Sequence, residues 1–363
     1  MRQVSKLIRF GLAALSHFQH GHSRPLATDQ LPGEAALGNE IGISNLPGSY
    51  ARLAKLSDGS VLAGFTTAEG PTKIIKVSKS TDGGRQFFPF GEITRGEGDI
   101  GNIFLLEIAP SVILGAFRNH SPGPGGMHFR ITVCKSTDGG KSWGFASQAF
   151  ELGGHLGIWE PFMRLSDRNP NEVQLTYSHE FAPNDQRTML VRSTDGGISW
   201  SRPEAVCFGN AVRDGMNGIA KTKDGNRDVL VMVFETTDNA PFFNVKAALS
   251  YDDGATWGYR QNVQVAPRDH NAGAPQIASF ADGCLAVVYM ADEGLGGSNW
   301  PHKASIKVTF AAPPRDGKMS WSTPQLAKES GFWPGILDVQ DNVAMITYDS
   351  GGPRAKPIQW SPK

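Results

Sequence analysis

Ser136-Thr137-Asp138-Gly139-Gly140-Lys141-Ser142-Trp143 is the stretch that decides the fold of this chain, because the same pattern recurs. Three further copies of Ser-x-Asp-x-Gly-x-x-Trp/Phe lie at 80–87, 193–200 and 250–257, and consecutive aspartates are 56, 57 and 57 residues apart. A fifth, degenerate copy ends at Trp321. Self-similarity at a fixed period indicates a repeat architecture built from one supersecondary unit.

The residues of this repeat, which we call the box, are typical of a tight turn. Its aspartate can accept hydrogen bonds from backbone N–H groups further along, as in Asx turns. Its glycine supplies the residue with positive φ, and its aromatic ring can fill the end of the hairpin. Each box follows a strand-like run, such as 129–133 or 188–191. We therefore interpret each box as the turn of a β-hairpin; one or two acids per copy do not make a calcium loop of the EF-hand type.

The chain between the boxes repeats one plan, in which two apolar strands precede a longer loop, a third strand, the box and a fourth strand. Six such strand pairs can be recognised, at 51–56 and 60–65, 103–108 and 112–117, 162–165 and 173–177, 219–221 and 229–234, 276–280 and 284–289, and 336–339 and 343–348. This predicts an all-β fold, a six-bladed β-propeller with four-stranded antiparallel blades. The last blade lacks a strand, so we expect the segment before Pro47 to complete it and close the ring.

Composition limits the function classes. The chain has 35 basic and 35 acidic residues and no net charge, which argues against a nucleic-acid partner or a polybasic membrane-surface protein. Its 43 glycines and 23 prolines disfavour a helical bundle. The sequence contains no run of 18 apolar residues, the length that a membrane-spanning helix needs. We therefore expect no membrane partner. We expect a monomer of one domain, 31–363, preceded by the segment 1–30.

Residues 1–30 and the cysteines carry less information. Arg2, Lys6 and Arg9 precede a short apolar run, 10–15, which makes a weak signal peptide. We expect an extracellular protein, with residues 1–30 as either a weak signal peptide or a disordered segment. Cys134, Cys207 and Cys284 lie in or beside apolar runs, which predicts buried side chains. No metal-ligand spacing and no cofactor motif is present, so we expect neither a metal nor a cofactor.

The propeller topology predicts where function lies. Because blade strands alternate in direction, the boxes share a face with the turns between first and second strands. Connections between second and third strands, and those between blades, gather on the opposite face, where loops converge on a central mouth. Acids, arginines, Trp and Tyr recur in those connections. This mixture suits a sugar, because aromatic faces stack on sugar rings while polar side chains hydrogen bond to the hydroxyls.

Two glutamates at this mouth are the candidate catalytic residues. Glu160 lies between Trp159 and Pro161 before an apolar strand, a partly apolar setting that raises a carboxyl pKa and suits a general acid. Glu235 directly follows the buried strand 231–234, and a nucleophile needs such rigid placement. A solvated loop acid is the alternative for each.

The remaining candidates are assigned to substrate binding. Glu180 is an alternative acid/base or a substrate contact, and Arg52, Arg118 and Arg213 can bind substrate or fix the carboxylates. For Tyr177 and Tyr348, which end apolar strands, core packing is the alternative. The full set of candidate substrate-binding residues is Arg52, Asp99, Arg118, Asn119, Trp159, Tyr177, Glu180, Arg213, Asp214, Asp292 and Tyr348.

The box is identified as the Asp-box (BNR) motif, and six predicted blades that carry such boxes in four copies and a degenerate fifth resemble the sialidase superfamily. The box is specific for the fold and almost silent about the reaction. True sialidases usually carry Arg-Ile-Pro in the first blade, where this chain has Ala51-Arg52-Leu53. Resemblance to sialidases implies that Arg52 and Arg213 bind a carboxylate, with Arg268 as the candidate third arginine, and that Tyr348 is the nucleophile.

The longer loops look more like fungal glycoside hydrolase family 93, the exo-α-1,5-L-arabinanases. The resembling stretches are 116–120, 159–162, 177–180, 184–186, 213–216 and 233–235. The resemblance implies a retaining enzyme with Glu160 as acid/base and Glu235 as nucleophile. Retention requires the two carboxyl groups about 5–5.5 Å apart.

The sequence thus predicts a retaining exo-glycosidase, a glycoside hydrolase that acts on the oligo- or polysaccharide arabinan. One alternative is a sialidase that hydrolyses terminal sialic-acid-type sugars. The other is a non-catalytic propeller that binds carbohydrate or protein.

Overall fold

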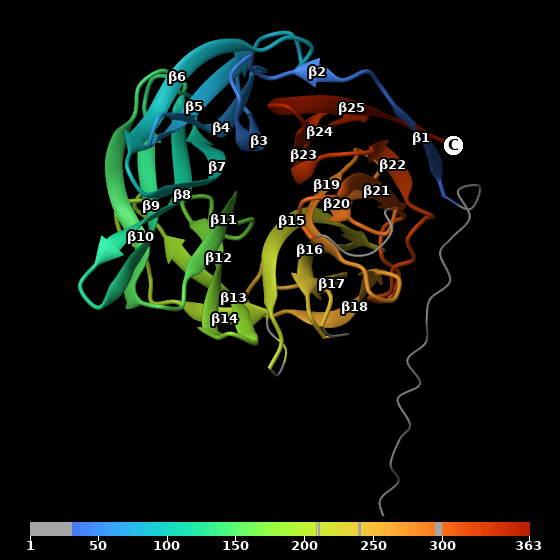
Figure 1. Cartoon of the computed structure of the whole chain (residues 1–363). Helices are drawn as coiled ribbons and strands as arrows, with labels where there is room; N and C mark the ends of the chain where they lie inside the picture. Colours follow the sequence, from blue (N-terminus) through green and yellow to red (C-terminus); the bar gives the residue numbers. More distant parts are fainter. Residues whose placement is uncertain (1–30, 208, 210, 239–240, 295–299) are drawn as a thin grey trace, which may run out of the picture.

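The computed structural model describes residues 31–207, 209, 211–238, 241–294 and 300–363, so the predicted segment 1–30 lies outside it. The described part consists of strands and their connections. Six sheets stand around a central axis as the blades of a propeller (Figure 1). The predicted all-β, six-bladed fold is confirmed. Within the described ranges, no helix has the length and apolar character that crossing a membrane requires.

Five blades are antiparallel meanders whose first strand lies nearest the axis (Figure 1). Blade 1 contains β3 (Ser49–Lys55), β4 (Val61–Glu69), β5 (Thr72–Ser80) and β6 (Phe88–Gly96). Blade 2 contains β7 (Asp99–Ala109), β8 (Val112–Gly123), β9 (Gly126–Ser136) and β10 (Gly144–Gly154). Blade 3 contains β11 (Ile158–Leu165), β12 (Val173–Ala182), β13 (Asp185–Ser193) and β14 (Glu204–Cys207). Blade 4 contains β15 (Asp214–Asp224), β16 (Arg227–Thr236), β17 (Asn244–Ser250) and β18 (Gly258–Gln264). Blade 5 contains β19 (Ala272–Ser279), β20 (Leu285–Ala291), β21 (Ser305–Ala311) and β22 (Gln325–Lys328).

Blade 6 is made from both ends of the chain. It contains β23 (Phe332–Gln340), β24 (Val343–Asp349) and β25 (Pro353–Pro362), and its outer strand is β1 (Gly33–Leu37). The short strand β2 (Ile41–Gly42) pairs with the other end of β25, so the N-terminal segment runs antiparallel along the last strand (Figure 1). The expectation that the segment before Pro47 closes the ring is confirmed. Ring closure leaves β25 paired on both edges, which removes an exposed strand edge.

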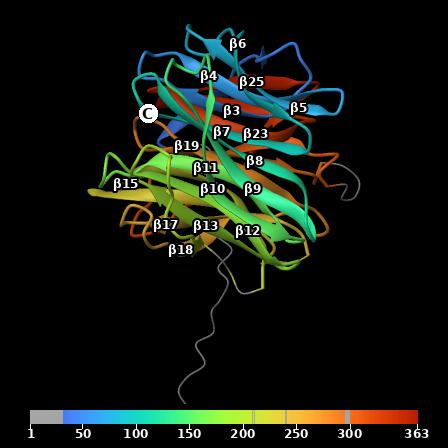
Figure 2. The same ribbon diagram turned by 90° about the vertical axis from the view of Figure 1, so that its left-hand side faces the viewer.

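The core consists of apolar side chains packed between neighbouring blades, which stand side by side in the view of Figure 2. The first strands of all six blades also line an axial channel of about 390 Å³. Apolar side chains such as Leu53, Phe104 and Met163 form much of its wall. The ring of blades therefore holds the ends of the first strands in a fixed circle around one axis.

The boxes are turns, as predicted. In the second box the buried Ser136 hydroxyl accepts the N–H of Gly140 at 2.9 Å, and Asp138 Oδ1 accepts the N–H groups of Lys141 and Ser142. The hydrogen bond from the Ser142 hydroxyl is the largest cause that holds the pKa of Asp138 well below its usual range, followed by those from the Ser142 N–H and the Ser136 hydroxyl. The box carboxylates therefore stabilise the turn itself.

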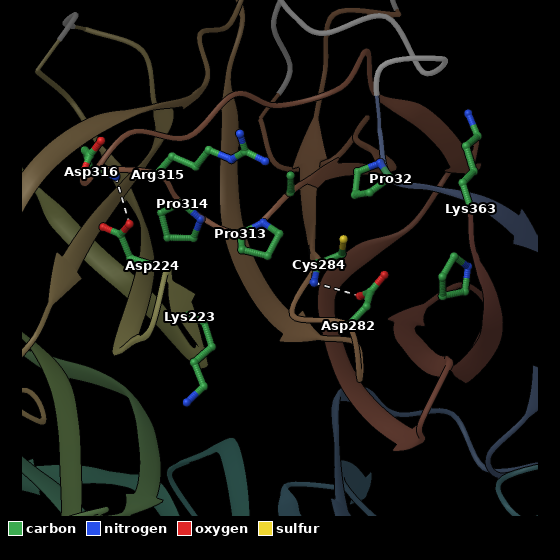
Figure 3. Close-up of a pocket in the computed structure, with 13 residues that line it drawn as sticks. Pro32, Lys223, Asp224, Asp282, Cys284, Pro313, Pro314, Arg315, Asp316 and Lys363 are labelled. Atoms are coloured by element: carbon green, nitrogen blue, oxygen red, sulfur yellow. Dashed lines mark hydrogen bonds between the residues drawn. The ribbon is translucent and has the colours of Figure 1, made fainter.

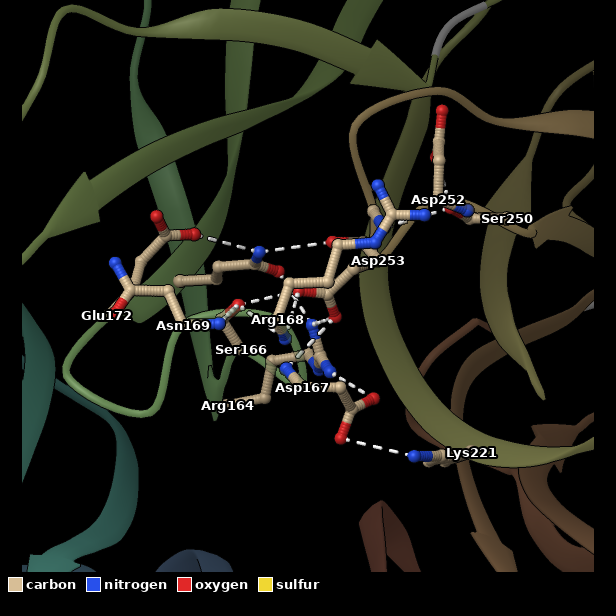
Figure 4. A network of polar contacts seen from close by, with 12 residues as sticks. Arg164, Ser166, Asp167, Arg168, Asn169, Glu172, Lys221, Ser250, Asp252 and Asp253 are labelled. Carbon is tan, nitrogen blue, oxygen red and sulfur yellow. Dashed lines mark hydrogen bonds and ion pairs between the residues drawn. The ribbon is translucent and has the colours of Figure 1, made fainter.

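The fourth box departs from the others in a way that ties two blades together. Asp253, with φ of 63°, stands where the other three boxes have glycine. Its buried carboxylate accepts from Arg164 at 2.7 Å and from Ser166 at 2.5 Å, both in blade 3 (Figure 4). We infer that these bonds offset the strain of a non-glycine residue in this region.

Candidate active site

A β-bulge near the start of every first strand shapes the mouth of the propeller. The register of the first two strands shifts at this point in all six blades. One residue per blade has positive φ there, between 48° and 58°. These residues, which we call the bulge ring, are Tyr50, Asn102, Glu160, Met216, Ala274 and Trp333. Bulges re-aim side chains, and non-glycine residues with positive φ cluster at functional sites.

A second ring of residues faces the first. The second-strand residues that pair beside each bulge, which we call the partner ring, are Thr66, Arg118, Ser178, Glu235, Met290 and Asp349. Four of them accept the N–H of the next blade's bulge residue. Glu235 accepts from Ala274 at 2.8 Å, Ser178 from Met216 at 3.1 Å, Met290 from Trp333 at 3.2 Å, and Asp349 from Tyr50 at 3.0 Å. The blades are thus fastened to one another at the mouth.

Glu160 comes from the bulge ring and Glu235 from the partner ring of the next blade. Burial raises the pKa of Glu235, which is 7% exposed, to about 7, although the Ala274 N–H and Arg213 oppose this. Burial and then the charge of Glu235 raise the pKa of Glu160 to about 8, against the opposing effects of Arg118, Ser178 and Arg213. The charge of Glu235 therefore favours the protonated form of Glu160, and the two carboxyl groups titrate as a coupled pair.

Arg213 lies beside this pair and is fixed by Glu180. Its Nη2 atom donates to Glu180 Oε1 at 2.6 Å and to Gln186 Oε1 at 2.7 Å. The other Glu180 oxygen accepts the backbone N–H of Gly157 at 3.0 Å. Both oxygens of Glu180 are thus engaged in holding Arg213 and a loop, whereas Glu160 lies at the mouth as a member of the bulge ring.

Arg118, Asp99 and Trp159 form one wall on the other side of Glu160. Arg118 pairs with Asp99 at 2.7 Å and donates to Asn102 Oδ1 at 2.6 Å, and its guanidinium lies 5.6 Å from the Trp159 ring centroid. A pocket of about 180 Å³ opens here, and Glu160, Asp99 and Arg118 all line it. The structure brings these predicted residues together.

Arg52 lies beneath the mouth rather than in it. It is 3% exposed, lines the axial channel and donates to the carbonyls of Ala51 and Trp333. Its guanidinium lies 3.9 Å from the ring centroid of Tyr50 and so supports that ring. Tyr50 lines the pocket beside Glu160.

Four other predicted residues have no exposed surface in this structure. Tyr177 stacks on Phe150 between blades 2 and 3, and the Tyr348 hydroxyl donates to Glu40 at 2.8 Å. The alternative of core packing describes both tyrosines. Asp214 pairs with Arg260 through both oxygens, and Asp292 accepts the N–H of Asn271. None of these four side chains reaches the mouth.

The predicted Asn119 and Arg268 contact neither glutamate of the mouth in the described structure. The Asn119 side chain donates to Thr132 at 3.1 Å and accepts from Arg130, so it is held within blade 2. Arg268 is 95% exposed and lies beside Asp269. No contact of Arg268 in the described part of the chain links this third arginine, implied by the resemblance to sialidases, to Arg52 or Arg213.

The mouth also contains residues that sequence reasoning missed. They include the bulge-ring members Tyr50, Asn102 and Trp333, and the partner-ring members Ser178 and Asp349. Bulge-ring residues follow one another at intervals of 52 to 59 residues, close to the period of the boxes. An alignment of the six blades on one another would have placed them in one column with Glu160.

An aromatic pair flanks Glu235. The rings of Phe243 and Trp300 lie 6.3 Å apart, and Trp300 packs over Gly273. A Cβ at Gly273 would lie 2.7 Å from Glu235 Oε2 and 3.1 Å from Trp300. Only glycine lets both side chains approach this closely.

A larger cavity lies elsewhere. It has a volume of about 1070 Å³ and is lined by turns around Asp224 and Asp282 that join first and second strands, as on the box face (Figure 3). Two of its carboxylates are already engaged, since Asp224 accepts from Tyr251 at 2.6 Å and Asp282 accepts from Trp360 at 2.7 Å. The cavity has no pair of buried carboxyl groups comparable to that at the mouth.

Comparisons with known proteins show what the chain is similar to. No family model matches its sequence, and neither does any curated protein. Among solved structures, it is similar to the family 93 α-L-arabinofuranosidase of Fusarium graminearum in complex with arabinobiose, with a TM-score of 0.64, 19% identity, and coverage of 90% of this chain and 98% of that one. It is also similar to the α-L-arabinanase of Penicillium chrysogenum in complex with arabinobiose, with a TM-score of 0.66, 16% identity, and coverage of 90% of this chain and 98% of that one.

A sialidase, NanB of Streptococcus pneumoniae, is also similar, with a TM-score of 0.59, 12% identity, and coverage of 90% of this chain and 70% of that one. At these identities the likeness shows the fold. The chain shares the six-bladed propeller of family 93 enzymes and sialidases.

Proposed function

We propose that this protein is a retaining exo-glycosidase that releases α-1,5-linked L-arabinose units from arabinan. The observation that carries the proposal is the pair of carboxyl groups at the mouth, the half-buried Glu160 and the buried Glu235, which have pKa values of about 8 and about 7. A retaining glycosidase needs one carboxyl group that stays protonated, as the general acid, and a second that ionises at lower pH, as the nucleophile. The solved structures with bound arabinobiose support the choice of sugar.

Glu160 acts as the acid/base. Its raised pKa keeps it protonated near neutral pH, so it donates a proton to the glycosidic oxygen as the bond to the leaving group breaks. Once ionised, it accepts a proton from the water that enters next. Arg118 and Arg213 favour the ionised form and so assist this return step.

Glu235 acts as the nucleophile. It is the more acidic of the two groups and ionises while Glu160 still holds its proton. The N–H of Ala274 fixes one oxygen at 2.8 Å and orients the carboxylate. Its attack on the anomeric carbon gives a glycosyl-enzyme, which water then hydrolyses with net retention of configuration.

The surroundings favour a neutral sugar over the carboxylated sialic-acid-type sugar of the sialidase alternative. Aromatic rings on both sides of the pair, Tyr50 and Trp333 on one and Trp300 on the other, offer faces for sugar rings. A sialidase would need converging arginines and a tyrosine nucleophile. Arg52 is bound to backbone carbonyls, and Tyr348 is buried against Glu40.

The proposal is tested by incubating the protein with linear arabinan and with a sialoside, and by identifying released products. We expect arabinose or a short arabino-oligosaccharide with retained anomeric configuration, and no sialic acid. Release of sialic acid alone would support the sialidase alternative. Turnover of neither substrate would leave a non-catalytic propeller.

A further inference from the structure

The pocket of about 180 Å³ beside Glu160 contains a hydroxyl group that the protein itself does not use. Thr66 is 8% exposed and lines this pocket, yet among the described residues its Oγ1 atom has no hydrogen-bond partner. Burial of an unpaired polar group is unfavourable, so such a group calls for an explanation.

Comparison with the rest of the partner ring shows that the unpaired Thr66 hydroxyl is unusual. At the equivalent position Ser178, Glu235, Met290 and Asp349 each accept the N–H of the next blade's bulge residue. Arg118 is a donor and cannot do so. Thr66 is thus the one partner-ring residue with an acceptor side chain that does not fasten two blades together.

The groups around Thr66 resemble a sugar-binding site. The pocket is lined by the aromatic rings of Tyr50 and Trp333 and by the polar side chains of Asn102, Asp99 and Arg118. The Tyr50 hydroxyl interacts with Asn102. Flat apolar faces together with fixed donors and acceptors are what a single ring with several hydroxyl groups requires.

Glycine at position 101 keeps the pocket open. A Cβ there would lie 3.5 Å from Thr66 Oγ1 and 3.5 Å from Arg118 Nη2, so an alanine would fit the protein but occupy the space between these two groups.

We propose that this pocket binds the sugar on the leaving-group side of the scissile bond and that the Thr66 hydroxyl hydrogen bonds to one of its hydroxyls. This inference rests on the proposed function. Glu160 lines the pocket and Glu235 does not. Since the general acid contacts the leaving-group oxygen and the nucleophile contacts the released sugar, a pocket beside Glu160 alone receives the leaving group.

The test compares Thr66→Val, which keeps the shape of the side chain, on two substrates. One is an arabino-oligosaccharide, and the other is a 4-nitrophenyl α-L-arabinofuranoside, whose leaving group lacks sugar hydroxyls. Loss of one hydrogen bond is expected to lower kcat/KM roughly tenfold on the oligosaccharide and leave the aryl substrate unaffected. Because an unpaired buried hydroxyl is removed, Tm should stay equal or rise.

Thr67→Val is the matched control. The neighbouring Thr67 is 7% exposed, and its hydroxyl donates to the carbonyl of Pro47 at 2.6 Å. This variant should lower Tm and affect both substrates alike. Gly101→Ala should reproduce the selective loss on the oligosaccharide.

Three results would overturn the inference: an equal loss on both substrates with Thr66→Val, no loss on either, or a fall in Tm like that of Thr67→Val. If the wild-type protein hydrolyses neither substrate, the proposed function fails. Saturation-transfer NMR with arabinobiose then still tests the pocket, since signals that persist in Gly101→Ala would exclude a sugar site there.

Discussion

The two faces of this propeller use carboxylates in opposite ways. On the box face, Asp138 is exposed and accepts several hydrogen bonds, which hold its pKa well below its usual range. At the mouth, Glu160 is half-buried and Glu235 is buried, each has fewer compensating bonds, and their pKa values are raised. Carboxylates that satisfy a turn stabilise the fold, whereas carboxylates kept from full satisfaction are available for proton transfer and attack.

The largest expected loss of activity comes from replacing Glu235 at the mouth. Glu235→Gln keeps an acceptor for the Ala274 N–H but removes the nucleophile, so kcat on linear arabinan should fall by on the order of 10⁴-fold. Steady-state kinetics measures this.

Asp349→Asn is the matched control for that variant. Asp349 occupies the same ring, accepts the N–H of Tyr50, and has a pKa raised by burial to about 7. The activity of the Asp349→Asn variant on linear arabinan should fall by about tenfold at most. If the two variants lost equal activity, the fastening of blades rather than nucleophilic attack would explain the loss.

Glu160→Gln should have the next largest effect, a loss of roughly 10²–10⁴-fold on arabinan. The loss should shrink on an aryl arabinofuranoside, whose leaving group needs little protonation. Wild-type kcat/KM should fall below a pH of about 7, where Glu235 becomes protonated, and above about 8, where Glu160 ionises. An alkaline limb that persists unchanged in Glu160→Gln would contradict its role as the acid.

A smaller effect is expected on the box face, and on stability instead of catalysis. Ser136→Ala leaves the buried N–H of Gly140 without its acceptor, which should lower the free energy of unfolding by roughly 1–3 kcal/mol. Urea denaturation measures this change, and kcat should be unaffected. Ser142→Ala, at an exposed position of the same box, should cost less.

A further effect on stability sharpens the comparison through pH. A carboxyl whose folded pKa lies above its unfolded value binds more protons when folded, so its contribution to stability falls as pH rises from about 4.5 to about 8. Glu160→Gln removes this contribution and should flatten the decline. Denaturation at pH 5 and pH 8 measures it, and an unchanged slope in the variant would argue against burial of the charge.

The sequence predicted the fold well because each box encodes its own turn. Asp138, Gly140 and Trp143 make contacts within eight residues, and the six strand pairs that recur at a similar spacing count the blades. Even the closure of the ring followed from a missing strand in blade 6. Because the hydrogen bonds of each box form within a short stretch that repeats at a fixed period, a single sequence is enough to recognise them.

The site was harder to predict because its geometry arises between blades. Glu160 and Glu235 were found from the strands that they adjoin, but the role of Tyr50 depends on Arg52 beneath it and Asp349 beside it. Tyr348 ends an apolar strand and precedes Asp349, yet its side chain points to Glu40. The two-residue alternation of a strand decides which of these neighbours faces the mouth, and the bulges shift that alternation in the first strands.

The central claim is that Glu235 attacks the sugar while Glu160 protonates the leaving group. The most direct measurement is intact-mass and peptide mass spectrometry of Glu160→Gln after incubation with an activated aryl α-L-arabinofuranoside, whose glycosyl-enzyme should accumulate when the base is missing. The account predicts the mass of one arabinosyl group on the peptide that contains Glu235, and its absence in Glu160→Gln/Glu235→Gln. Release of the aryl group with no covalent adduct, or an adduct on another residue, would contradict it.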